Sequence, residues 1–154
     1  MAMKSFRGKI KSSGIDNISL HTNTGATGYR ITKLELFPAS PGSTSYEIVF
    51  KIFKIPQTAV TGTVDFSDQT LLAAGYLEGN ASNQYTDGSN VIFDSEVFNQ
   101  DITLTSIDND GDTEEVNYYM ELEQVKLDLS ENTVATLKDI RNITSSAWVQ
   151  QFTI

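Results

Sequence analysis

The amino-acid sequence predicts an all-β protein, a single-domain antiparallel β-sandwich of jelly-roll-like type over residues 1–154. Three observations predict this fold class. Apolar and polar residues alternate along most of the chain, about eight segments show the alternation, and runs containing Gly, Asn, Asp or Pro separate them. A length of 154 residues suits one domain, and no repeat or linker divides the chain.

The expected strands follow one another along the chain. The first three are Ser5–Lys11, Ile18–Thr22 and Tyr29–Phe37. The fourth, Tyr46–Phe53, is the clearest, because its even-numbered residues are all apolar and lie on one face of a half-buried strand. The remaining strands are expected at Thr70–Glu78, Asn90–Phe98, Asp101–Ile107 and Val116–Gln124.

Two features near the end of this series need separate explanations. The apolar residues of the last strand are even-numbered up to Leu122, but Val125 and Leu127 are odd-numbered, which requires a bulge, a bend or a crossing between sheets. Beyond it, Ser130–Thr133 offers helix-cap residues before apolar residues at helical spacing. The sequence therefore predicts at most one short helix near residues 130–141, with a strand as the alternative because the run is short and β-branched.

Composition bears on the functional class. The net charge of −9 disfavours nucleic acid as a partner, and no segment is apolar and long enough to suggest a membrane partner. The chain has no cysteine and one histidine, His21, at the end of a predicted strand. These counts exclude disulfides and cysteine nucleophiles, and no nucleophile-elbow, phosphate-loop or zinc-protease motif occurs. We therefore expect a protein that is not an enzyme and has no cofactor.

The charge is distributed unevenly. Four of the 11 basic residues, Lys4, Arg7, Lys9 and Lys11, lie in the first predicted strand or directly before it, ahead of any acidic residue. The chain from Asp16 onward has 7 basic and 20 acidic residues, a net charge of −13. Lysines commonly keep an edge strand soluble, which is one interpretation. The other is that this basic strand docks on the acidic surface of a partner.

An apolar tail closes the chain, and Trp148 and Phe152 are its largest side chains. It either forms a final strand of the sheet or packs on a neighbouring subunit, since a terminus not tied to its own domain often buries itself elsewhere. With the basic strand, Trp148 and Phe152 are the candidate partner-binding residues.

The acidic run Asp108–Asp112 is the one candidate metal site. Its carboxylates Asp108, Asp110 and Asp112 alternate as the oxygen ligands of calcium often do. The run departs from the EF-hand pattern, because Gly111 is at loop position 4 and position 12 is Tyr119. Asp-Gly is also an ordinary turn signal, so the favoured interpretation is a solvated hairpin tip between the last two strands.

Four stretches carry a resemblance to a known group of proteins. They are Gly28–Pro38 (GYRITKLELFP), Gly62–Ala74, Val91–Ile102 and Thr133–Asn142. Together they resemble small virion structural proteins of marine tailed bacteriophages. The resemblance implies a capsid decoration (cement) protein that binds the major capsid protein lattice on the outer capsid surface of the virion, as a homotrimer.

Two other classes stay open. A tail or head-fibre adaptor, or receptor-binding protein, would present the Pro38–Ser45 and Gly79–Asn90 loops to the host surface. A calcium-dependent carbohydrate-binding module would use the Asp108–Asp112 loop.

Overall fold

The computed structural model describes residues 2–42, 45–79 and 86–128. Within these ranges every regular element is a strand. The strands are β1 (Met3–Ile10), β2 (Gly14–Ile18), β3 (Thr27–Pro38), β4 (Tyr46–Phe53), β5 (Leu71–Gly79), β6 (Thr86–Phe93), β7 (Ile102–Asp108) and β8 (Val116–Lys126). The predicted helix near residues 130–141 and the tail with Trp148 and Phe152 lie outside the described residues.

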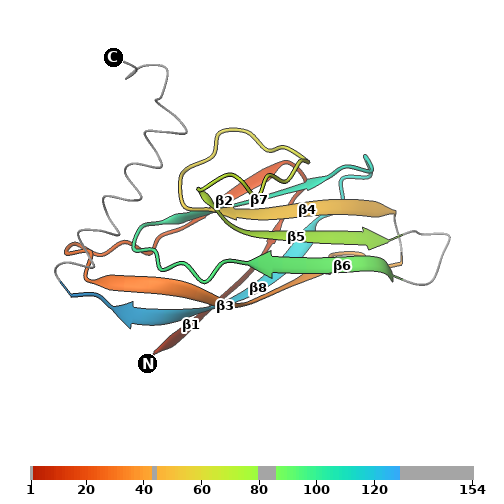
Figure 1. The fold of residues 1–154 in the computed structure, drawn as a ribbon. Helices are drawn as coiled ribbons and strands as arrows, with labels where there is room; N and C mark the ends of the chain where they lie inside the picture. Colours follow the sequence, from red (N-terminus) through yellow and green to blue (C-terminus); the bar gives the residue numbers. More distant parts are fainter. Residues whose placement is uncertain (1, 43–44, 80–85, 129–154) are drawn as a thin grey trace, which may run out of the picture.

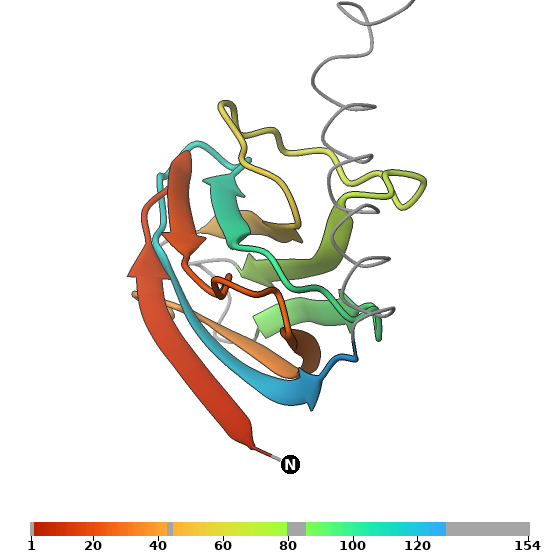
Figure 2. The ribbon, with the colours of Figure 1, turned by 90° about the vertical axis from the view of Figure 1, so that its left-hand side faces the viewer.

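The strands form two antiparallel sheets that pack face to face as a β-sandwich (Figures 1 and 2). One sheet has three strands in the order β1-β8-β3, and the other has five in the order β2-β7-β4-β5-β6. The predicted fold class is confirmed. Stacked sheets of this kind bury the inward side chains of both layers in a shared core.

The strand order follows the nested winding of a jelly roll. The first strand pairs with the last, the second with the seventh, and the fourth with the fifth. The fourth pair of the nest, β3 with β6, is reduced to one bridge between Tyr29 and Phe98, five residues beyond the end of β6. β6 pairs along its length with β5 instead and so extends the five-stranded sheet.

The core lies between β4 and β8. Ile48, Phe50 and Ile52 face inward from β4, and the Phe50 and Tyr118 rings lie 5.8 Å apart between centroids. The Leu36 side chain of β3 lies directly against Gly75 of β5, where a Cβ atom would overlap it. Glycine is therefore required there by space rather than by backbone conformation.

Two strands lie away from their predicted positions. β2 ends at Ile18, where Ile18–Thr22 was predicted, because the Asp101 carboxylate accepts hydrogen bonds from the next free backbone N–H groups, those of Leu20 and His21, at 2.7 and 2.9 Å. β6 begins at Thr86, although Thr86–Ser89 contains the turn signal Asp-Gly. Pairing with β5 overrides this local preference for a turn, as tertiary contacts often do.

The change in apolar parity at the end of β8 is not accompanied by a register shift in β8 itself, whose residues pair without interruption. A register shift does occur, but it lies on the partner strand β3, between Ile31 and Lys33, where Thr32 is the extra residue.

The predicted hairpin between the last two strands is wrong. β7 and β8 belong to different sheets, so the Asp108–Asp112 loop crosses from one layer of the sandwich to the other. An Asp-Gly turn signal marks the turn but does not specify whether its flanking strands pair.

Candidate functional site

The outer face of the three-stranded sheet is the surface on which basic and aromatic side chains meet. Cross-strand register places Lys9 of β1 and Phe37 of β3 on either side of Asn117 of β8, and Arg7 beside Tyr119. Together they border a shallow hollow. No described segment covers this face in Figure 2. We call these five residues, Arg7, Lys9, Phe37, Asn117 and Tyr119, the cationic face.

Phe37 is the most unusual member of the cationic face. Its side chain is 65% exposed, although an aromatic ring is among the residues most stabilised by burial. Lys9 Nζ lies 3.7 Å from Glu115 Oε2, but both side chains are about half exposed, so the pair adds little stability. Arg7 forms no ion pair with any residue in the described ranges. An exposed ring flanked by a cation whose charge is not neutralised is typical of a protein-binding surface.

The rest of this outer face is neutralised. Arg30 Nη2 donates to Glu123 Oε2 at 2.8 Å, and Lys33 Nζ lies 3.8 Å from Glu35 Oε1. Lys33 also lies over the Tyr119 ring, 5.7 Å from its centroid. Arg7 is therefore the basic side chain of this face that has no ion pair among the described residues.

The four basic residues of the N-terminal strand do not form one surface. Alternate side chains of a strand point to opposite faces, so Arg7 and Lys9 face outward with Phe37, whereas Lys4 is turned the other way. Its ammonium lies 5.8 Å from the centroid of the Tyr29 ring. Lys11 follows the end of β1, in the turn in which Gly14 N–H donates to Lys11 O at 2.9 Å.

Asp108, the first residue of the candidate metal loop, is buried and organises the loop through its carboxylate. Its Oδ1 accepts hydrogen bonds from the backbone N–H groups of Glu47 and Asp110, each at 3.0 Å. Its Oδ2 accepts from Glu114 N–H at 2.9 Å. Both carboxylate oxygens of Asp108 therefore already accept hydrogen bonds from backbone N–H groups. Across the described ranges, no group of three or more acidic, histidine or cysteine side chains is arranged to hold a metal ion.

His21 joins the ends of two strands at the rim of the sandwich. Its Nδ1 lies 2.7 Å from Asp101 Oδ1, the oxygen that also accepts from Leu20 N–H and His21 N–H. Burial alone would raise the pKa of Asp101, but the hydrogen bonds from His21 and Leu20 outweigh it and bring that pKa below its usual value. These hydrogen bonds hold the segment after β2 to the start of β7, and they involve no serine, threonine or cysteine that could act as a nucleophile.

Sequence periodicity did not reveal a buried lysine on β4. Residues 54–70 pass over the outer face of the five-stranded sheet between β4 and β5 (Figure 1), and Lys51 lies beneath them, 6% exposed. Lys51 Nζ donates to Thr61 Oγ1 at 3.0 Å and to Thr63 O at 2.8 Å. Burial lowers the pKa of Lys51, against the opposing effect of Asp68. A cavity of about 510 Å³ adjoins this contact. Alternation within a strand cannot show that a later loop covers its polar face.

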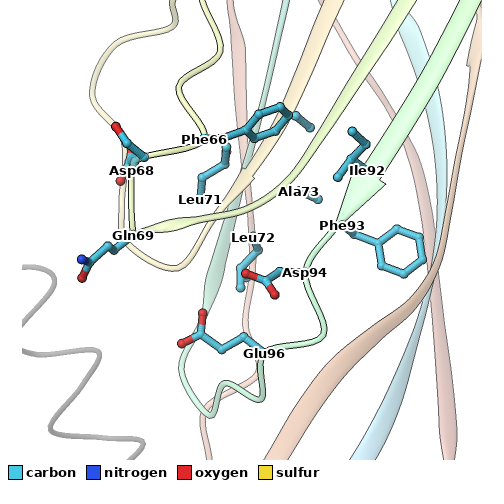
Figure 3. A pocket seen from close by; sticks show the side chains of 12 residues that line it. Phe66, Asp68, Gln69, Leu71, Leu72, Ala73, Ile92, Phe93, Asp94 and Glu96 are labelled. Carbon is cyan, nitrogen blue, oxygen red and sulfur yellow. The ribbon is translucent and has the colours of Figure 1, made fainter.

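A second hollow lies at the free edge of the five-stranded sheet, between β5, β6 and the Phe66 end of the loop (Figure 3). It has a volume of about 460 Å³. We call it the β5–β6 groove.

Comparison with known proteins adds no family assignment: no protein-family model matches the chain, and neither does any curated protein. No helix within the described residues is long and apolar enough to cross a membrane.

Proposed function

We propose that this protein is a non-enzymatic structural protein of a bacteriophage virion. Specifically, it is a capsid decoration protein that binds the major capsid protein lattice on the outer surface of the head as a homotrimer and stabilises it. The resemblance of four stretches of the chain to small marine phage virion proteins supports this class. The cationic face supplies a docking surface.

The observation that carries the proposal is the exposure of Phe37 beside Arg7 and Lys9. On the assembled head, Phe37 would leave water, and Arg7 would meet a carboxylate of the capsid protein. Burial of an aromatic side chain contributes about 2–3 kcal/mol. A fully desolvated arginine contact adds specificity, since it fixes the geometry of the carboxylate it binds.

Stabilisation follows from mass action. A protein that binds the assembled lattice, but not the free subunit, shifts the equilibrium toward the lattice. Three docking surfaces on one trimer act together, so weak individual contacts give tight binding. The acidic remainder of the chain keeps the protein soluble before it docks.

Binding to heads that lack the protein tests this proposal. Particles from the parent phage with this gene deleted are mixed with purified full-length chain and separated by sedimentation. We expect Arg7→Glu to reduce binding at least tenfold and Lys126→Glu to leave it unchanged. The two substitutions change the net charge equally, but Lys126 is exposed at the far end of β8. Equal binding by the two variants would remove the cationic face as the docking surface.

A further inference from the structure

The β5–β6 groove combines exposed apolar side chains with acidic ones. Phe66 reaches into it from the loop that precedes β5, and Ile92 lines it from β6 (Figure 3). These two side chains are 67% and 57% exposed. Large apolar side chains gathered around one hollow mark an interaction surface, in contrast to single ones scattered over a protein.

Carboxylates form the other part of the groove. Asp68, Asp94 and Glu96 line it, and no basic side chain does. Lys54 is buried and its Nζ lies 3.0 Å from Glu96 Oε2, which neutralises that carboxylate. Asp94 has no ion-pair partner in the described part of the chain, whereas Asp68 accepts hydrogen bonds from Thr70 and interacts with the charge of Lys51. The groove therefore fits a segment that presents an apolar side chain next to a cation.

The first residues of β1 have this chemistry. Met3 is 53% exposed, and Lys4 follows it on the same edge strand. β1 lies on one side of the sandwich and β6 on the other (Figure 2), so one chain cannot bring the two together. We propose that the β5–β6 groove of one copy binds the start of β1 of a second copy. The Met3 side chain packs against Phe66 and Ile92, and the long Lys4 side chain, on the other face of β1, leaves the Tyr29 ring and turns toward Asp94, just beyond the end of β6.

Charge excludes the symmetric alternatives. Two β1 strands placed edge to edge would bring the basic residues Lys4, Arg7 and Lys9 of both copies close together, and two grooves placed together would do the same with their carboxylates. Like charges brought together in this way oppose association. Only a contact between the basic start of β1 in one copy and the acidic groove of another places opposite charges together. Such a head-to-tail contact closes into a ring when its rotation allows.

The backbone favours the same contact. β1 pairs only with β8, and β6 pairs only with β5, so each strand has one edge without a strand partner among the described residues. An extended segment placed beside such an edge gains main-chain hydrogen bonds. The cationic face stays available in this arrangement, because its side chains project from the face of the sheet rather than from its edge.

Disulfide trapping between two single-cysteine variants tests the contact, since the natural chain has no cysteine. Met3→Cys and Ile92→Cys proteins are purified separately and oxidised alone or as a mixture. We expect the cross-linked dimer to form in the mixture at a yield at least tenfold above that of either variant alone. Cross-linking of Met3→Cys with itself to the same extent would overturn the head-to-tail contact, and so would the absence of any cross-link.

Charge exchange gives an independent readout by light scattering of the full-length chain. Lys4→Glu and Asp94→Lys should each lower the mass toward that of one 17.0 kDa chain, and the double variant should restore the assembly. Phe37→Ser is the matched control and should leave the mass unchanged. A wild-type protein that is monomeric, or single variants that keep its mass, would overturn the proposal.

The trimer itself rests on the proposed function. Light scattering separates the number of chains in the assembly from the contact that holds them together. If the wild-type protein forms an assembly of another size and the single variants disrupt it, the groove contact is supported and the trimer is contradicted. Loss of capsid binding by Phe37→Ser, without a change in mass, concerns the docking surface alone.

Discussion

Tyr29 and Phe98 exchange both of their backbone hydrogen bonds across the open side of the sandwich. Tyr29 N–H donates to Phe98 O at 2.7 Å, and Phe98 N–H donates to Tyr29 O at 2.9 Å. Their rings, both buried, lie 6.3 Å apart between centroids. This bridge ties β3, an edge strand of the smaller sheet, to the segment that leads from β6 to β7. It holds the two layers together where the nested strand pairing is incomplete.

The Phe98 ring should therefore contribute much of the stability on this side. Phe98→Ala leaves a cavity under β3, and we expect it to lower the free energy of unfolding by about 3–5 kcal/mol. Phe66→Ala, at an exposed ring, should change it by less than about 0.5 kcal/mol. Urea unfolding, monitored by circular dichroism in the far ultraviolet, measures the free energy of unfolding of both variants. Similar losses for the two variants would contradict this role of the bridge.

Asp108 should stabilise the loop that crosses between the sheets. Asp108→Ala removes the acceptor of three backbone N–H groups, and we expect a loss of about 2–4 kcal/mol, because an unsatisfied buried donor costs about 1–3 kcal/mol. Asp112→Ala, at an exposed position, is the control and should have little effect. Thermal unfolding distinguishes them, and an equal effect of both would contradict the account.

The same loop should not respond to calcium. Because amides occupy the Asp108 oxygens, we expect the midpoint of thermal unfolding to be the same in millimolar calcium and in chelator. A rise in that midpoint with calcium, lost in Asp108→Asn, would instead favour the calcium-dependent carbohydrate-binding module.

Asp101 should make stability depend on pH at the acidic end. Its pKa is lower in the folded chain than in the unfolded chain, so the ionised carboxylate favours folding. This contribution is present above the usual aspartate pKa of about 3.9 and is lost as the pH falls through the lower folded value. Asp101→Asn should flatten the stability profile below about pH 4 relative to the wild type. An unchanged profile would contradict the assignment.

Lys51 should hold residues 54–70 against the five-stranded sheet. Lys51→Met keeps most of the buried side chain but removes the hydrogen bonds to Thr61 and Thr63, at a cost of about 1–3 kcal/mol. Hydrogen exchange across residues 54–70 should become faster, while exchange in β8 stays slow. Lys33→Met, at an exposed lysine, is the control. Unaltered exchange in the loop would show that other contacts hold it.

Local alternation was enough to predict strands whose surroundings agree with it. Tyr46–Phe53 has the predicted bounds because one face of it meets the core along its whole length. β2 was misplaced because the hydrogen bonds that end it come from Asp101, far along the chain. Sequence spacing at Asp110-Gly111 marked a turn but could not show that the two flanking strands join different sheets.

The candidate site was less accessible to sequence analysis than the fold. Arg7 and Lys9 were identified from their charge, but Phe37 reaches them only through the pairing of both edge strands with β8. No local pattern relates two residues of separate strands in this way. The β5–β6 groove likewise depends on where the chain before β5 leaves Phe66.

The measurement that tests the central claim most directly is a count of copies bound to heads that lack this protein. Purified full-length chain is titrated onto the particles to saturation, and bound copies are counted by quantitative mass spectrometry against the major capsid protein. We predict a saturating number that is a multiple of three and matches the number of equivalent lattice sites, with heads that then resist heat better. Saturation at a few copies per particle would contradict the account and point to a tail or head-fibre adaptor, and no binding at all would contradict it outright.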